Sequence, residues 1–229
     1  MLKIWRRLAV QDGSTHSLNT LPSLPAPTFE ISLAVGVLFA LVASGVLAAD
    51  KFTWFLESAP AIIGLVLAVL TFRRFRLTRL LYVLLTVHAF ILILGGLYTY
   101  AKVPLGFWLK DLLHLQRNPY DRIGHFAQGF VPAILAREIL LRKRIVTRKG
   151  WLGFLCVCIC LAFSAFYELI EWWTAVLSGD AANDFLGTQG DVWDTQWDMF
   201  TALCGAISAV VILAPWHNKL LQRHLSKTP

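Results

Sequence analysis

Six hydrophobic stretches, separated by short charged loops, constrain this chain more than any other feature of its sequence. A helix needs roughly 20 apolar residues to cross a bilayer. The pattern predicts spans over residues 31–49, 59–72, 80–100, 123–141, 151–173 and 199–216, the second being short unless residues 52–56 extend it. Only 15% of the residues are charged, against about 25% in soluble domains. We therefore predict an all-α fold, a polytopic membrane helix bundle with six transmembrane helices.

The basic residues predict the side of the membrane on which each loop lies. Fifteen Lys and Arg residues lie before the first span, in the second and fourth loops and in the tail, whereas five lie in the other loops. Because cytoplasmic loops carry an excess of Lys and Arg, both termini are expected in the cytoplasm. We divide the chain into a flexible cytoplasmic lead (1–30), a single membrane domain (31–216) and a cytoplasmic tail (217–229). The lipid bilayer thus accounts for the net charge of +7, and we expect no nucleic-acid partner.

Local patterns predict how some helices begin and pack. Pro60 suits the first turn of the second span, and residues 105–119 predict a short helix in the outer membrane interface, with its apolar side chains on one face. Small residues recur every four positions from Gly36 on the first span and from Gly205 on the sixth. Such residues let two membrane helices approach closely, so we expect both ridges to lie at helix contacts.

The fourth span begins with polar residues that share one helical face. In YDRIGHFAQG, the spacing of Asp121, His125 and Gln128 is i, i+4, i+7. A structural alternative exists for Asp121, because a carboxylate in the first helical turn is stabilised by the helix dipole. A structural alternative also exists for His125, because its ring could simply form a hydrogen bond with a backbone carbonyl. Function and structure are both open for this pair.

The fifth and sixth spans add acidic residues at the same predicted side. The fifth ends in SAFYELIEWW, where Glu168 lies inside the apolar run and shares a face with Glu171. A charged carboxylate there is costly unless it is paired or protonated, so we favour a functional role over a structural network. Ahead of the sixth span, Asp191, Asp194 and Asp198 also share a face. The first two fit an acidic capping box, which leaves Asp198 unexplained.

These residues form one candidate functional cluster on the outer side. Its members are Asp121, His125, Glu168, Glu171, Asp191, Asp194 and Asp198. So many carboxylates cannot all ionise together without cations, so either several stay protonated or one divalent metal ion neutralises them. The candidate metal ligands are His125, Glu168, Glu171, Asp194 and Asp198. Oxygen-rich sites with one imidazole suit Mg, Mn, Fe or Zn.

Three stretches, DRIGHFAQG, FYELIEWW and GTQGDVWDTQWDM, resemble the YjdF-like family of bacterial inner-membrane proteins, a family classed as a domain of unknown function. The resemblance runs roughly from the first span to the sixth. It implies a multi-pass protein of the bacterial inner (plasma) membrane and brings no established reaction. The seven residues of the cluster match the family pattern, which does not by itself make them catalytic.

Three functions fit these observations. The first is a membrane enzyme whose outer-face metal acts on a lipid or cell-envelope intermediate. The second is a proton-coupled transporter using Glu168 and His88, although the cytoplasmic half offers few buried polar groups beyond Arg137 and Glu138, which we expect to reach the inner interface. The third is a non-catalytic membrane scaffold, in which the acids form a structural network.

Overall fold

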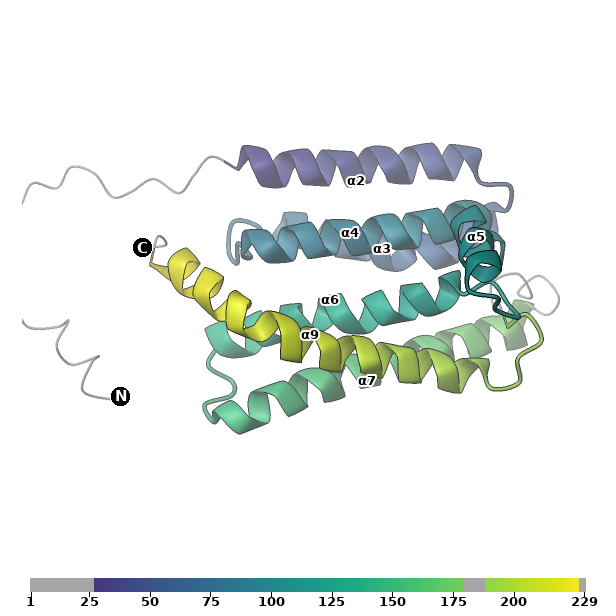
Figure 1. Cartoon of the computed structure of the whole chain (residues 1–229). Helices are drawn as coiled ribbons and strands as arrows, with labels where there is room; N and C mark the ends of the chain where they lie inside the picture. Colours follow the sequence, from purple (N-terminus) through teal and green to yellow (C-terminus); the bar gives the residue numbers. More distant parts are fainter. Residues whose placement is uncertain (1–26, 179–187, 227–229) are drawn as a thin grey trace, which may run out of the picture.

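The computed structural model describes residues 27–178 and 188–226, and every regular element within those ranges is helical (Figure 1). In chain order these are α2 (Thr28–Leu47), α3 (Lys51–Thr71), α4 (Arg79–Tyr98), the 3-10 helix η1 (Tyr100–Lys102), α5 (Pro104–Leu112), α6 (Tyr120–Arg142), α7 (Lys149–Ser178) and α9 (Asp194–Leu225). The all-α prediction is confirmed for the described residues. A short helix, α5, also follows the third predicted span.

The second predicted span begins earlier than its apolar core suggests. Asp50 is the N-cap of α3, because its carboxylate accepts the backbone N–H groups of Phe52 at 2.9 Å and Thr53 at 3.2 Å. The helix therefore starts at Lys51 and includes residues 52–56, which makes it long enough to span. Placing Pro60 in the first turn was wrong, since it lies inside α3.

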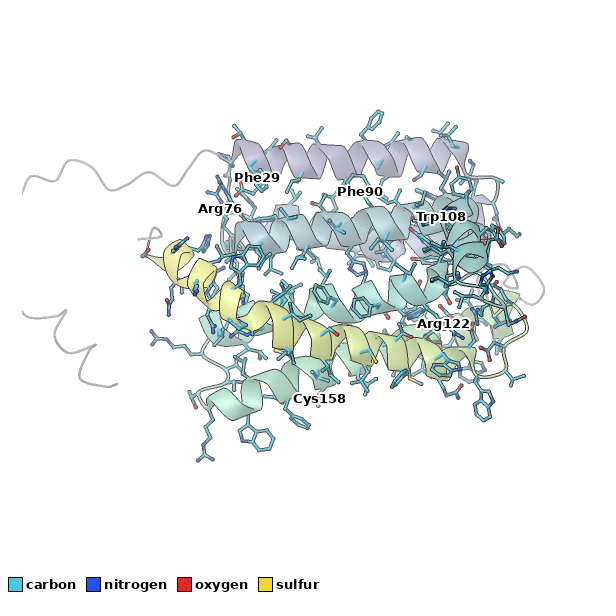
Figure 2. All side chains as sticks on the ribbon, in the orientation of Figure 1. Phe29, Arg76, Phe90, Trp108, Arg122 and Cys158 are labelled. Atoms are coloured by element: carbon cyan, nitrogen blue, oxygen red, sulfur yellow. The ribbon has the colours of Figure 1, made fainter. Side chains whose placement is uncertain are left out.

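The helices run side by side in two groups, and α6 lies between them. Figure 1 shows α2, α3 and α4 on one side of α6, with α7 and α9 on the other. α6 packs most extensively against α9 and also contacts α4 and α7. We call the end with α5 and the starts of α6 and α9 the acidic end. The opposite end, with the starts of α2, α4 and α7, is the basic end; Figure 2 labels Arg122 at the first and Arg76 at the second.

Glycines allow the close crossing of α6 and α9. A Cβ atom on Gly129 would collide with the carbonyl oxygen of Ala202, and one on Gly205 would collide with that of Phe126. The small-residue ridge predicted at Gly205 is thus confirmed as a helix contact. Of the ridge predicted from Gly36, a Cβ on Gly36 itself meets nothing within 4 Å, whereas Ala40 packs against a buried cluster and Ser44 is buried and accepts a hydrogen bond from Trp54.

The outward faces of the bundle are apolar, as a membrane environment requires. Phe39, Val46 and Leu70 are each more than 70% exposed, as side chains that face lipid would be. Five described helices are long and apolar enough to cross a membrane: α2, α3, α4, α7 and α9. α6 has comparable length but carries many polar side chains, each of which is buried or partly buried. Sequence and structure therefore agree on a membrane protein with several apolar helices.

Two polar residues of α6 lie where the sequence did not predict them. Arg137 and Glu138, expected to reach the interface, are 6% and 0% exposed near the basic end. Glu138 accepts hydrogen bonds from the backbone and hydroxyl of Thr78 at 3.1 and 2.8 Å, while Arg137 contacts His217 at 2.7 Å. The expectation that they extend outward was wrong, because buried partners on α4 and α9 satisfy them.

Candidate functional site

The connector between α5 and α6 fixes the start of α6 at the acidic end. Asn118 is 1% exposed; its side-chain oxygen accepts the N–H of Tyr120 at 3.0 Å and its amide donates to the carbonyl of Val103 at 3.0 Å. Gln189, ahead of α9, exchanges two hydrogen bonds of 3.0 Å with the backbone of Asn118. These contacts tie the first turn of α6 to the loop that leads into α9.

His125, one turn into α6, is 5% exposed and has acceptors near both ring nitrogens. Its Nδ1 lies 3.0 Å from Oε1 of Gln128 and 3.8 Å from a carboxylate oxygen of Glu168. Its Nε2 lies 3.6 Å from a carboxylate oxygen of Asp121. Because the Gln128 oxygen can only accept, it favours the tautomer with the proton on Nδ1. The Nε2 lone pair then points to the side where Asp121 lies.

Two sets of side chains around His125 have the spacing that a metal ion needs. One ligand atom from each of Asp121, His125 and Asp198 can be chosen so that all lie within 4.8 Å of one another, and the same holds for His125, Glu168 and Glu171. Asp198 is 2% exposed and Glu168 is 7% exposed. Oδ1 of Asp198 and Oε1 of Glu168 have no hydrogen-bond partner among the described residues. Each set thus contains one buried carboxylate oxygen without a donor in the part of the chain that the structure describes.

The other two acids of the cluster are bound by arginines. Arg117 forms ion pairs with Asp194 through a very short contact, with Asp191 at 3.5 Å and with Asp121 at 3.8 Å. Arg122 pairs with Asp191 at 2.8 Å. The structure therefore divides the cluster into acids neutralised by arginine and acids gathered around His125, with Asp121 in contact with both groups.

The loops at this end have the electrostatics of a tightly paired network. Burial lowers the pKa of Arg117, but its hydrogen bond to Asp194 and the neighbouring carboxylates outweigh burial, so the pKa is raised. The backbone N–H of Trp193, together with Arg122 and Arg117, holds the pKa of Asp191 below its usual value. Both groups therefore stay charged at neutral pH.

All seven residues predicted from the sequence lie together at this end, linked by the contacts above. The capping box does not form, because Trp193 is the N-cap of α9 and Asp191 accepts its N–H at 3.0 Å. Arg117 and Gln189 were not predicted as site residues. Arg117 stands four residues before Asp121, a spacing that could have suggested the pair, although residues 118 and 119 between them are Asn and Pro.

A small cavity of about 50 Å³ lies beside His125. Glu57 of α3, which is 1% exposed, lines it and accepts the backbone N–H of Tyr100 at 3.3 Å. Tyr167 packs edge-on against His125 with 6.3 Å between ring centres. His88 of α4 also lines this cavity, and its Nε2 is buried without a hydrogen-bond partner among the described residues. The site therefore extends from the acidic end toward the centre of the bundle.

Comparisons with known proteins agree with the resemblance drawn from the three motifs. A family model described as a predicted membrane protein (DUF2238) matches residues 29–219. The inner membrane protein YjdF of Escherichia coli (strain K12) is 55% identical over 183 residues, which cover 80% of this chain and 88% of that protein. No solved structure matches.

Proposed function

We propose that this chain, which belongs to the family of predicted membrane proteins designated DUF2238, is a six-span protein of the bacterial inner membrane. At its periplasmic end it would bind a divalent cation and act on a lipid or envelope substrate. The cation would bind His125 and the carboxylates around it. The substrate would approach from the outer leaflet.

The six-span topology rests on the position of α6. Its 23 residues measure about 35 Å at 1.5 Å per residue, enough to cross the hydrocarbon core. Polar side chains are tolerated inside a membrane where other helices cover them, as α4, α7 and α9 cover α6. Five apolar helices and α6 make six spans. The arginines of the basic end support an orientation in which that end faces the cytoplasm, and both termini would then be cytoplasmic.

The observation that carries the cation proposal is Oδ1 of Asp198, a buried carboxylate oxygen that has no donor among the described residues and belongs to the set with Asp121 and His125. A buried carboxylate without a partner is costly unless a proton or a cation neutralises it. We place one ion at Nε2 of His125 with Asp121 and Asp198, because that nitrogen keeps its lone pair while Gln128 occupies Nδ1. Asp194, a ligand candidate from sequence, would instead position Arg117.

An ion in this position would supply Lewis-acid chemistry. It would polarise a phosphoryl or carbonyl oxygen of a substrate, or lower the pKa of a bound water molecule so that it attacks. Glu168 and Glu171, on the Nδ1 side of His125, would orient the imidazole rather than contact the ion or its water. The exposed indoles of Trp172, Trp173 and Trp193 lie at the same end and suit contact with lipid headgroups.

The test is elemental analysis of protein purified in detergent without chelator, comparing wild type with Asp198→Asn, Glu171→Gln and the control Asp111→Asn. Asp111 is exposed on α5 and belongs to neither ligand set. We expect near-stoichiometric divalent metal in wild type and Asp111→Asn, with the largest loss in Asp198→Asn. Metal at background in folded wild-type protein, or equal metal in all four samples, would contradict the proposal.

Proton-coupled transport remains the second candidate, and the position of His88 favours it. This residue lines both the small cavity beside His125 and a larger one that extends toward the basic end. A transporter would need His88 as a relay, so His88→Ala would abolish proton-coupled uptake in proteoliposomes. An outer-end enzyme would keep its bound metal in the same variant. A scaffold predicts a third result, in which acid-neutralising variants lose only thermal stability.

A further inference from the structure

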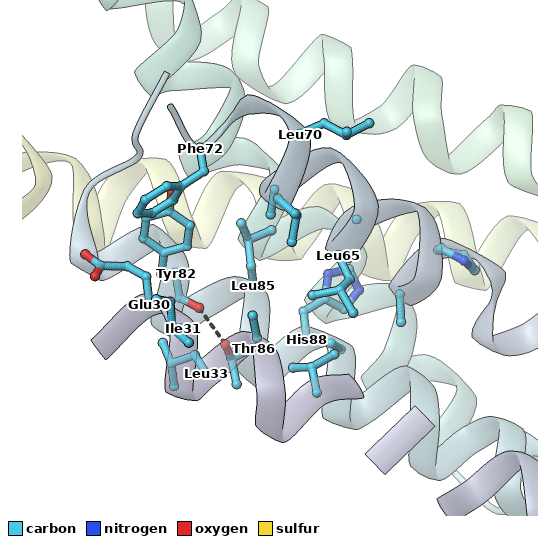
Figure 3. A pocket seen from close by; sticks show the side chains of 18 of the residues that line it. Glu30, Ile31, Leu33, Leu65, Leu70, Phe72, Tyr82, Leu85, Thr86 and His88 are labelled. Atoms are coloured by element: carbon cyan, nitrogen blue, oxygen red, sulfur yellow. Dashed lines mark hydrogen bonds between the residues drawn. The ribbon is translucent and has the colours of Figure 1, made fainter. Parts of the chain in front are cut away.

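A large apolar cavity lies among α2, α3 and α4 near the basic end. Its volume is about 790 Å³, within the range of about 300–1,000 Å³ that is typical of ligand pockets. Leu33 and Val37 of α2, Leu65 of α3, and Leu85 and Leu92 of α4 line it. Figure 3 shows Glu30 and Phe72 at one end and His88 toward the other. An apolar lining of this extent is suited to an apolar ligand group.

The cavity opens toward the surroundings of the bundle. Ile31 of α2 and Val69 and Leu70 of α3 belong to its lining, yet all three are more than half exposed. They therefore form its mouth between α2 and α3. A Cβ atom on Gly64, which also lines the cavity, would meet nothing within 4 Å. In a membrane, such a mouth opens onto the hydrocarbon chains of the lipids.

The polar groups at the outer limit of the cavity are basic. Arg73 and Arg74, exposed in the turn that follows α3, belong to the lining. The carboxylate of Glu30 does not cancel them, because it is 5% exposed and pairs with Arg76 at 2.8 Å. Two cationic side chains at the mouth of an apolar cavity complement an anionic headgroup.

The length of the cavity matches the thickness of one leaflet of the bilayer. The lining residues of α3 run from Pro60 to Leu70, which is about 15 Å along a helix, and Arg73 and Arg74 follow just beyond its end. One leaflet contributes about 15 Å of hydrocarbon and a few more of headgroup region. A lipid oriented as in the bilayer, with its headgroup at the basic end, would thus place the tip of its chain near Leu92 and His88.

We propose that this cavity binds an anionic phospholipid from the leaflet at the basic end. One acyl chain lies among α2, α3 and α4, and the phosphate lies against Arg73 and Arg74. This site is at the opposite end of the bundle from the proposed cation site, and it does not depend on that function.

Two glycines of the same environment supply the central test. Gly64→Leu fills the cavity, whereas Gly36→Leu adds the same side chain on α2 outside the cavity lining, and neither Cβ meets a neighbour. Native mass spectrometry of full-length protein would measure binding of phosphatidylglycerol and of phosphatidylcholine with identical chains. We expect Gly64→Leu to lose bound lipid at least tenfold and Gly36→Leu to bind like wild type. Equal binding by both variants would mean surface lipid only and would overturn the proposal.

The headgroup contact is tested with Arg73→Gln combined with Arg74→Gln, which changes exposed side chains and leaves the core intact. A basic residue near anionic lipid contributes about 1 kcal/mol, so the double variant should bind phosphatidylglycerol about thirtyfold more weakly. Binding of phosphatidylcholine should not change. A variant that keeps the wild-type preference for phosphatidylglycerol would refute the assignment of the headgroup to these arginines.

Discussion

Glu138 on α6 and His217 on α9 are both 0% exposed, and their Oε2 and Nε2 atoms lie 3.0 Å apart. Arg137 contacts the other ring nitrogen of His217 at 2.7 Å, and an arginine can only donate. Nδ1 of His217 is therefore the acceptor and Nε2–H donates to Glu138. Arg142 completes the network with a hydrogen bond of 2.9 Å to Glu138. At the basic end, α6 and α9 are thus joined by a polar contact in which every ring nitrogen has a partner.

Removing the imidazole from this network should destabilise the protein strongly. His217→Asn leaves the buried Glu138 carboxylate with one donor fewer, and breaking a buried charged contact costs about 3–5 kcal/mol. We expect a marked fall in the Tm measured in detergent. His114→Asn is the matched control, because His114 is exposed and has a φ of 53°, which Asn tolerates. Equal Tm values for the two variants would show that the network contributes nothing to stability.

The two arginines of the acidic end should differ in their contribution to stability. The side chain of Arg117 is 13% exposed and pairs with three carboxylates, whereas that of Arg122 is 29% exposed and pairs with one. Buried pairs cost more to break than exposed ones. We expect Arg117→Gln to lower the free energy of unfolding by about 3 kcal/mol and Arg122→Gln by about 1 kcal/mol or less. Chemical unfolding in detergent measures both, and the reverse order would contradict the geometry.

Much of the candidate site could be predicted from helical periodicity alone. Asp121 and His125 are one turn apart on α6, and Glu168 and Glu171 are one turn apart on α7, so each pair lies on one face whatever the tertiary structure. Because consecutive helices of the bundle run antiparallel, the loops then bring those faces to one end. The helix termini were less predictable. Capping side chains determine where a helix begins, and the cap formed by Asp50 starts α3 at Lys51, before the predicted start of that span.

The remainder depends on packing that no local pattern encodes. Arg117 enters the site because Asn118 and Gln189 join two distant loops. His217, beyond the sixth predicted span, becomes buried because α9 continues through it to Leu225. Partners so far apart in the chain are brought together only by the fold. A sequence motif identifies each residue but not the distant residues that it contacts in the folded protein.

The cap on α3 predicts a pH-dependent contribution to stability. The hydroxyl of Thr53 donates to Asp50 at 2.6 Å, and this bond, with the backbone N–H groups of Thr53 and Phe52, lowers the pKa of Asp50 in the folded protein. A lowered folded-state pKa stabilises the protein above the unfolded-state pKa of about 4, and the stabilisation is lost as pH falls through the folded-state value.

Asp50→Asn keeps a capping oxygen without the charge, so comparison with wild type isolates this term. We expect wild type to be the more stable at pH 7, with the difference shrinking below about pH 4. Thermal unfolding of both proteins over this pH range measures the difference in their stability. The contributions of the other titrating acids are the same in both proteins and cancel in that difference. A difference that stays constant with pH would mean that the Asp50 charge does not contribute to the cap.

The crossing of α6 and α9 should tolerate no side chain at its glycines. A methyl group on Gly129 or Gly205 would collide with a backbone carbonyl of the other helix, and backbone atoms cannot move aside as a flexible side chain can. Overpacking of this kind costs about 1–3 kcal/mol or more. Gly129→Ala should therefore lower the Tm, and the widened crossing should also reduce metal retention, because His125 on α6 and Asp198 on α9 would separate. Gly36→Ala, where a Cβ meets nothing, should instead stabilise α2 by about 0.5–1 kcal/mol. If Gly129→Ala matched Gly36→Ala in both measurements, the close crossing would not be the contact that holds the two halves of the site together.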